Sequence, residues 1–411
     1  MTSLSSTNPT RGRWWIVVAA VLVQLALGAV YAWSVFNKPL QAQFGWSKSE
    51  AVLPFEVVIG TIVIGSLVGG RIQDRYGPRP VAFGGVALYS AGTMLAALVS
   101  SPGQLWLLVL TYGVLGGIGL GAAYITPIAM LTKWFPDRRG LITGIAVGGF
   151  GLGALVTAPV ATRMIQSIGV LPTFAWLGAG FLVVTMVTGF FMQNPPEGYR
   201  PAGWTPSALQ SSQRAGADYS LGGALKTWQW WALWALLFLN TSAGISLISQ
   251  EAPIFQELTK VSAIIAAGMV GIVSIGNAAG RVFWAWVSDA ITRRWTFAVM
   301  FTLQVLLFWL LPGLVSASVV TIVAFIILMC YGGGFGTMPA FAADYFGAKN
   351  VGPIYGLMLT AWGFASAFGP LLIANLRQST GGYASGLHII AGVMAASILL
   401  PALVSPPRAK A

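Results

Sequence analysis

One charged side chain lies well inside a long apolar segment. Arg281 follows the run Gly276-Asn277-Ala278-Ala279-Gly280, in an apolar stretch that begins near Val261. A cationic side chain at the centre of a membrane-spanning helix costs about 2.5–3.5 kcal/mol on insertion scales. Arginine cannot relieve this cost by losing its proton, because the guanidinium stays charged in proteins. Arg281 therefore requires an anion or a wet cavity, and no acidic residue lies within one turn of it on its own segment.

Two kinds of partner could meet this requirement. The planar guanidinium can donate two parallel hydrogen bonds to one carboxylate, as a bound substrate would offer. Asn277, one turn earlier on the same helix face, could donate to that substrate or hold the guanidinium. The alternative is structural: Arg281 pairs with a backbone carbonyl or a distant carboxylate, and Asn277 bonds to a neighbouring helix. We favour a substrate, because ionisable residues inside membranes usually mark functional sites.

The composition is that of an integral membrane protein. Of 411 residues, 56% are hydrophobic and 8% are charged, whereas soluble domains carry about 25% charged residues. The single cysteine, Cys330, excludes an internal disulfide framework, and the single histidine, His388, argues against a zinc site. We find no set of catalytic residues, and so we expect no enzyme activity, no metal and no cofactor. The net charge of +12 does not indicate nucleic-acid binding, because the positive charges are distributed by membrane side.

Twelve apolar segments have the length of membrane-spanning helices. They cover approximately residues 14–36, 51–72, 80–100, 104–132, 139–165, 171–192, 228–250, 261–288, 295–315, 317–342, 351–376 and 385–404. The stretch between the sixth and seventh is rich in Pro, Gly, Ser and Gln, which indicates a solvent-exposed linker. The sequence therefore predicts an all-α membrane protein with two six-helix bundles, residues 1–193 and 227–411, joined by a cytoplasmic linker at 194–226.

The positive charges of the loops are unevenly divided between the two membrane sides. With the N-terminus placed in the cytoplasm, sixteen Lys and Arg residues fall on that side and five on the other, and Arg281 is left inside a helix. Cytoplasmic loops carry an excess of Lys and Arg. This distribution predicts a multi-pass protein of the cell inner membrane with both termini in the cytoplasm.

Two turns of the first half recur in the second half. The segment from Gly70 to Arg79 is matched by the segment that contains Asp289 and Arg294, at the same spacing of Asp and final Arg. The turn that begins at Lys133 has a counterpart that begins at Asp344. Parallel repeats of six helices place a transport site between the halves, near the membrane midplane.

Charged residues at the cytoplasmic helix ends could form ion pairs that close that side and break when the halves move. The alternative is that these charges only set the topology and aid solubility, since surface pairs contribute little. The candidate gating residues are Asp74, Arg75, Arg79, Asp289 and Arg138.

Several of these stretches resemble one transporter family. Residues Gly70 to Arg79 resemble the loop signature of the major facilitator superfamily. Trp134 to Gly144 and Gly28 to Trp33 resemble the monocarboxylate transporters and the oxalate/formate antiporter group, and Asn277 with Arg281 resembles the Asp/Arg pair of the animal monocarboxylate transporters. The chain is identified as a member of this superfamily, similar to bacterial monocarboxylate (lactate) transporters.

Departures from the family pattern bear on the substrate. Asn277 stands where the animal transporters have Asp, and Val35 where they have a first-helix Lys, which puts their way of handling the proton in doubt here. Trp362 stands where the oxalate antiporter has a second cation. Two cations suit a dianion, and Arg281 alone suits a monoanion. L-lactate, pyruvate or a similar small monocarboxylate is therefore favoured over oxalate.

The resemblance also points to aromatic residues around the substrate. A small anion needs hydroxyl donors and a tight apolar wall that excludes water, although ordinary packing between helices is the alternative for each residue. The candidates are Tyr31, Tyr124, Tyr331, Phe335 and Trp362, with Leu27, Ile145 and Phe364 as weaker ones.

The mechanism that this family implies is alternating access by a rocker-switch motion of the two halves, and we expect the protein to be a monomer. A proton is expected to accompany the anion, carried by the substrate or by an acidic side chain such as Glu56 or Glu251. Glu56 is also open to a simpler interpretation, as a solvated residue near the outer end of its segment. The alternative functions are carboxylate exchange of the oxalate/formate type, and a sensor or channel. The expected partners are a small carboxylate, a proton and the lipid bilayer.

Overall fold

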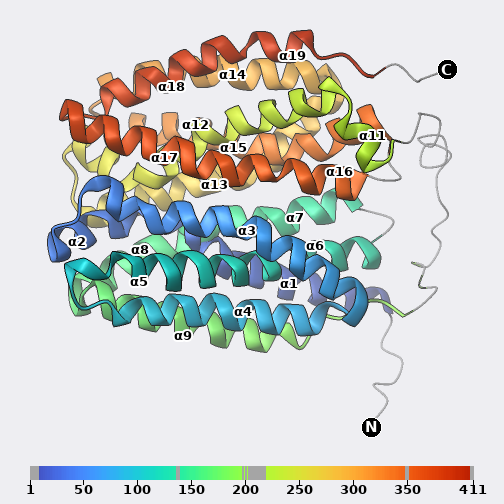
Figure 1. Ribbon diagram of the computed structural model, residues 1–411, viewed down its shortest axis with the longest axis horizontal. Helices are drawn as coiled ribbons and strands as arrows, with labels where there is room; N and C mark the ends of the chain where they lie inside the picture. The colour runs from blue at the N-terminus through green and yellow to red at the C-terminus, as the bar shows by residue number, and fades with distance from the viewer. Residues whose placement is uncertain are drawn as a thin grey trace.

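The protein is all-helical over the residues that the structure describes. The structure is a computed structural model, and it describes residues 9–135, 139–196, 199, 201, 219–347 and 351–407. Over these ranges, twelve segments are long and apolar enough to cross a membrane. The predicted fold class is confirmed, with twelve spans arranged in two layers (Figure 1).

The first six spans are built from helices that break in several places. In chain order they are α1 (Pro9–Leu27), η1 (Gly28–Ala32), α2 (Ser34–Phe44), α3 (Lys48–Tyr76), α4 (Pro78–Leu95), η2 (Ala96–Leu98), η3 (Pro102–Gln104), α5 (Leu105–Leu108), η4 (Val109–Gly116), α6 (Gly117–Trp134), α7 (Arg139–Gly151), α8 (Gly153–Ile168) and α9 (Val170–Gly189).

The last six spans follow a short helix at the end of the linker. They are α11 (Leu221–Leu225), α12 (Trp228–Thr259), α13 (Ala263–Ile291), α14 (Arg293–Leu310), η6 (Leu311–Gly313), α15 (Ala317–Phe346), α16 (Val351–Met358), α17 (Thr360–Thr380), α18 (Ala384–Ser397) and α19 (Leu399–Leu403).

Local sequence signals fix where the key helices begin. At the start of α3, the Ser47 hydroxyl accepts the Glu50 amide, and the Glu50 carboxylate accepts the Ser47 amide, which is a capping box. The Ser262 hydroxyl accepts the Ile265 amide and caps α13. These caps set the register of the helices that carry Glu56 and Arg281.

The two groups of six spans meet along two lines of contact. In Figure 1 the blue-to-green helices form one layer and the yellow-to-red helices the other. α3 packs along α17, and α13 packs along α7 and α8. The proposed domain limits, 1–193, 194–226 and 227–411, stay a prediction, because most of the linker lies outside the described residues.

The bundles are hydrogen-bonded to each other at one end. We call this end the α2 side, and the opposite end, where α1 begins and α19 ends, the termini side (Figure 1). Three donors of the first bundle reach the second at the α2 side: Asn37 to the Ser249 carbonyl, Lys38 to Gln256, and Ser49 to Asn375. Between described residues, we find no such bond at the termini side.

Glycines allow α13 and α15 to approach each other closely. A Cβ atom at Gly280 would lie 2.0 Å from the carbonyl oxygen of Met329, and one at Gly336 would lie 2.0 Å from the carbonyl oxygen of Arg281. Small residues at such crossings let two backbones touch. The close contact holds the backbone of Arg281 against α15, which also carries Tyr331 and Phe335.

We predict that Gly280→Ala destabilises the protein, because its new methyl group overlaps the α15 backbone. Overpacking of this kind costs about 1–3 kcal/mol. Gly268→Ala is the matched control on the same helix, since no atom lies within 4 Å of its added Cβ, and it should leave stability unchanged or raise it slightly. Thermal melting of the detergent-purified variants measures both, and equal melting temperatures would contradict the packing.

Candidate functional site

Arg281 is buried where the two bundles meet. Its side chain is 3% exposed, and its backbone lies against Gly336 of α15. The Nε and Nη1 atoms have no hydrogen-bond partner among the described residues, and no described carboxylate lies within 4.0 Å of the guanidinium. Its carbon Cζ lies 5.1 Å from the centre of the Phe335 ring, a distance that suits a cation–π contact. Among the described residues, the structural alternative of an ion pair between Arg281 and a protein carboxylate is therefore not seen.

Asn277 lies one turn before Arg281 and is also buried. It is 1% exposed, and its Oδ1 atom has no hydrogen-bond partner. Its backbone lies against Gly332 of α15, where an added Cβ would lie 2.0 Å from the Asn277 carbonyl oxygen. The pair Asn277 and Arg281 thus presents unpaired polar atoms on one face of α13.

The five aromatic residues predicted from the family resemblance lie in one cluster. Tyr31 and Tyr124 come from the first bundle, and Tyr331, Phe335 and Trp362 from the second. The ring centres are 6.1 Å apart for Tyr31 and Tyr331, 6.1 Å for Tyr124 and Trp362, and 5.3 Å for Phe335 and Trp362. All five are at most 7% exposed. Their positions agree with a shared wall, and their role in binding remains a prediction.

A hydroxyl pair joins the two bundles inside this cluster. The Tyr31 and Tyr331 oxygens are 3.0 Å apart, within hydrogen-bonding distance. The Tyr331 ring occupies space beside Gly244 of α12, where an added Cβ would lie 2.4 Å from the ring. The Arg281 guanidinium interacts electrostatically with both hydroxyl groups and with that of Tyr124. A buried cation is thus surrounded by hydroxyl donors and aromatic faces.

Helix breaks place several of these residues. Tyr31 lies in the 3₁₀ segment η1, where the sequence predicts one continuous helix over 14–36. At the start of this segment, Gly28 allows a close approach to α7, because a Cβ at Gly28 would lie 2.0 Å from the Phe150 carbonyl oxygen. Trp362 lies in the first turn of α17, after a break at Leu359. Irregular backbone at membrane depth is tolerated where protein buries it or where it lines a cavity.

Sequence reasoning missed two aromatic members of the site. Phe150 of α7 is fully buried, and its ring centre lies 5.1 Å from that of Tyr31 and 5.0 Å from that of Tyr124. The hydroxyl group of Tyr355, on α16, interacts electrostatically with Arg281. The only signal near them in the sequence is a neighbouring glycine, since Phe150 lies between Gly149 and Gly151 and Tyr355 precedes Gly356. Many other aromatic residues of this chain also have a glycine neighbour, so this signal does not identify them.

The three weaker candidates for the wall of the site differ in how deeply they are buried. Leu27 is fully buried in the last turn of α1, and Ile145 of α7 is partly buried. Phe364 is 64% exposed and packs against Trp234, with ring centres 5.9 Å apart. It lies on the outer surface, so the expectation that it lines the site is wrong. The register of α17 turns this position away from Trp362.

The candidate gating residues show contacts within their own bundle. Arg79 is exposed and donates to the Phe190 carbonyl and to Gln193. Arg75 lies over the ring of Tyr76. The side chains of Asp74 and Asp289 and the whole of Arg138 lie outside the described part of the structure. Their role in gating remains a prediction.

Two carboxylates are buried inside the spans. Glu56 of α3 is 4% exposed and Glu251 of α12 is 3% exposed, and one carboxyl oxygen of each has no described hydrogen-bond partner. The interpretation of Glu56 as a solvated residue is wrong in this structure, because Ser366 of α17 packs over it and donates to its carbonyl oxygen at 3.1 Å. Both residues are thus candidates for carrying a proton.

The described residues contain no cluster of three or more His, Cys, Asp or Glu side chains that could hold a metal ion. The cluster around Arg281 offers one fixed cation, the hydroxyl groups of its tyrosines, the indole N–H of Trp362 and a wall of aromatic rings. Such a site can bind and enclose a small anion.

Known proteins resemble this chain over most of its length. The sequence profile described as "Major Facilitator Superfamily" matches residues 16–370 and 269–411. The oxalate:formate antiporter of Oxalobacter formigenes is 27% identical over 410 residues, with 98% of this chain and 94% of that protein covered. Apicoplast pyruvate carrier 1 of Toxoplasma gondii is 25% identical, with 84% and 74% covered.

Two further comparisons concern part of the chain and the fold. Monocarboxylate transporter 2 of Mus musculus is 26% identical over 214 residues, which is 51% of this chain and 42% of that protein. The crystal structure of a bacterial homologue of the human lysosomal transporter Spinster has a TM-score of 0.68 at 17% identity, with 97% and 96% of the two chains covered.

We predict that the hydroxyl groups of Tyr31 and Tyr331 are energetically coupled. Tyr31→Phe and Tyr331→Phe should each cost about 0.5–1.5 kcal/mol of stability, and the double variant should cost less than the sum, because both remove the same bond. Melting temperatures of the four proteins measure this coupling. Tyr31→Phe combined with Tyr89→Phe is the control and should be additive, since Tyr89 packs elsewhere, on Phe181. Additivity in the first cycle as well would show that the hydroxyl pair does not form.

Proposed function

The chain belongs to the Major Facilitator Superfamily, a family of secondary transporters and not of enzymes, and on that basis we propose that it transports a small monocarboxylate. L-lactate and pyruvate are the favoured substrates. Relatives of this chain bear the names of transporters for oxalate and formate, pyruvate, and monocarboxylates. The named substrates share a carboxylate group on a small molecule, which is the chemistry that the site suits.

One observation carries the proposal: Arg281 is buried, and no carboxylate of the described residues lies within 4.0 Å of its guanidinium. Its Nε and Nη1 atoms have no described partner, and the planar guanidinium can donate two parallel hydrogen bonds to one carboxylate. Leaving a buried cation unpaired is costly, so a substrate carboxylate would supply the missing charge. Asn277 would assist from the preceding turn, and the hydroxyl pair of Tyr31 and Tyr331 would offer donors to a second polar group of the substrate.

The charge of the site supports a monoanion. Arg281 is the charged member of the cluster, and Trp362 contributes an indole N–H at the position where the antiporter resemblance places a second cation. The Trp362 Nε1 atom is buried and has no described hydrogen-bond partner, so it could donate to a neutral hydroxyl or keto oxygen. A 2-hydroxy or 2-keto acid would use both the guanidinium and this donor.

The proposed transport cycle is alternating access. Hydrogen bonds join the bundles at the α2 side, and the rocker-switch motion would break them while the termini side closes. Binding of the anion would neutralise Arg281 and so remove the main obstacle to closing a dry cavity around it. The residues Asp74, Arg75, Arg79, Asp289 and Arg138 would contribute to closure of the termini side.

The distribution of positive charge supports the assignment of the termini side to the cytoplasm. In that orientation, the hydrogen bonds between the bundles at the α2 side lie toward the outside of the cell, and we place the protein in the inner membrane. We propose a monomer, since each bundle contributes residues to one central site and no second copy is needed to complete it.

Proton symport would keep the transport of a monoanion electroneutral. Arg281 cannot carry the proton, because the guanidinium does not deprotonate in proteins. The remaining carriers are the substrate carboxylate, Glu56 and Glu251, and the last two are buried. The alternative is exchange of two carboxylates, which the similarity to the oxalate:formate antiporter favours.

We predict that Arg281→Lys abolishes uptake of L-lactate and pyruvate into proteoliposomes. A lysine keeps the charge but cannot make two parallel hydrogen bonds. Asn277→Ala should weaken uptake without abolishing it, because it removes a neutral contact worth about 0.5–1.5 kcal/mol. Full uptake by Arg281→Ala would refute the assignment of the site, and binding of the same acids by the purified variants separates lost affinity from lost motion.

We predict that lactate influx makes the external medium of proteoliposomes more alkaline. Glu56→Gln and Glu251→Gln identify the carrier: the variant that loses alkalinisation but keeps lactate exchange has lost the proton site. If both variants retain alkalinisation, the proton travels on the substrate. Uptake that depends on internal carboxylate and is insensitive to pH would instead establish exchange and reject symport.

A further inference from the structure

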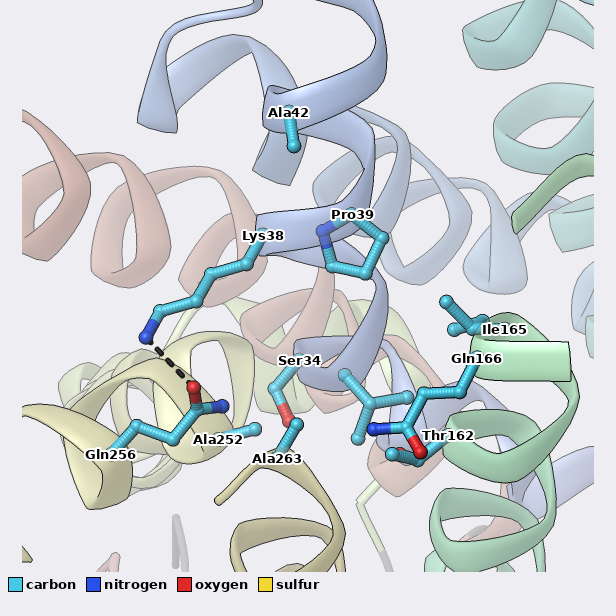
Figure 2. A pocket seen from close by; sticks show the side chains of 11 residues that line it. Ser34, Lys38, Pro39, Ala42, Thr162, Ile165, Gln166, Ala252, Gln256 and Ala263 are labelled. Atoms are coloured by element: carbon cyan, nitrogen blue, oxygen red, sulfur yellow. Dashed lines mark hydrogen bonds between the residues drawn. The ribbon is translucent and has the colours of Figure 1, made fainter. Parts of the chain in front are cut away.

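A cavity lies between the two bundles at the α2 side. Its volume is about 310 Å³, and Figure 2 shows the side chains around it. α2 and α8 form one wall, and α12 with the first residue of α13 forms the other. None of the residues of the Arg281 cluster lines it. The cavity therefore lies on the boundary along which the bundles would separate, and apart from the central site.

Two hydroxyl groups deep in this cavity have no partner. Ser34 of α2 is 1% exposed and Thr162 of α8 is 5% exposed. Neither Ser34 Oγ nor Thr162 Oγ1 has a hydrogen-bond partner among the described residues. Buried polar side chains are normally hydrogen-bonded, so both hydroxyl groups are available as donors to a ligand in the cavity. Ser34 also lies one turn beyond Tyr31 of the central cluster along the chain.

Lys38 lies at the exposed edge of the same cavity. Lys38 is exposed, and its Nζ donates to Oε1 of Gln256 on α12 at 2.9 Å (Figure 2). This bond uses one of its three donors. No described carboxylate lies within 4.0 Å of Nζ, because the nearby Glu257 is held by Arg377 at 2.7 Å.

The charged groups near Lys38 are mostly positive. Burial lowers the pKa of Lys38, and the cations Arg377 and Lys260 lower it further, while Glu257 opposes them. Gln166 of α8 adds a neutral amide to the lining (Figure 2). The lining of the cavity contains one cation, hydroxyls and amides, and no acidic residue. Such a lining suits an anion and repels a cation.

We propose that this cavity is a second anion site, in which Lys38, Ser34 and Thr162 hold a small carboxylate between the α2-side solution and Arg281. The identity of the ion rests on the proposed function, but the sign of its charge does not. The volume exceeds that of a three-carbon acid, so the ion keeps part of its water. Binding here is therefore weaker and less selective than at Arg281.

The site also connects arrival of the anion to opening of the α2 side. Lys38 donates across the bundle boundary to a neutral amide, and a carboxylate is the stronger acceptor for an ammonium group. An anion bound by Lys38 competes with Gln256 and weakens one of the bonds that hold the bundles together.

A single reporter thiol tests the charge of the cavity. Cys330 is the only cysteine in the sequence, so Cys330→Ala with Ala263→Cys places one thiol on the cavity wall. In detergent-purified protein, we compare its reaction rates with a sulfonate-bearing and a trimethylammonium-bearing methanethiosulfonate. Lys38→Gln should lower the ratio of the two rates on the order of fivefold to tenfold, because one unit charge attracts one reagent and repels the other. Ala42→Cys, on the rim, is a second reporter.

A control and a competition experiment complete the test. Lys48→Gln removes a cation from the same side of the protein but outside the cavity, and it should leave the rate ratio unchanged. In an Arg281→Ala background, L-lactate should slow the sulfonate reagent, and Lys38→Gln should abolish this protection. An unchanged ratio in Lys38→Gln, or protection that does not need Lys38, would overturn the proposal. If Lys38→Gln lowers the rate ratio but L-lactate does not slow the sulfonate reagent, the cavity attracts anions and lactate is not the anion that it binds. Uptake that depends on Arg281 tests the proposed transport function separately.

Discussion

A guanidinium that cannot lose its proton, held inside a membrane-spanning helix, is the constraint on which the rest of this structure depends. The described residues offer Arg281 no carboxylate within 4.0 Å. They offer it an aromatic face, tyrosine hydroxyl groups and an asparagine one turn away. A permanent protein anion would neutralise the guanidinium, and a substrate carboxylate would then find no unpaired positive charge to bind. An exchangeable anion makes the charge state of the cavity depend on whether cargo is bound.

The packing of the helices serves this arrangement. Glycines on α13 and α15 bring the backbone of Arg281 against α15, and Tyr31 and Trp362 lie at breaks in the helices, in η1 and just after Leu359. The hydroxyl pair of Tyr31 and Tyr331 then closes the cluster across the bundle boundary. Because residues of both bundles share one cluster, any motion of one bundle against the other must change the surroundings of Arg281. The cavity at Lys38 lies on the same boundary, closer to the α2 side.

The sequence predicted the helices better than their breaks. Twelve apolar segments identify the spans, and Arg281 stands out because its charge conflicts with its surroundings. The five aromatics needed the family resemblance, since periodicity alone does not separate them from packing residues. Phe150 and Tyr355 were missed for that reason. Phe364 was wrongly included, because a shift of two residues along α17 moves a side chain from the interior to the surface. The burial of Glu56 depends on α17 packing over α3, a tertiary contact that a single sequence does not reveal.

The most direct measurement is an experimental structure with L-lactate or pyruvate bound. The account predicts the carboxylate within hydrogen-bonding distance of two nitrogen atoms of the Arg281 guanidinium, enclosed by Tyr31, Tyr331 and Trp362. A structure in which the acid binds elsewhere, while the Arg281 guanidinium is bonded to a carboxylate of the protein, would contradict it.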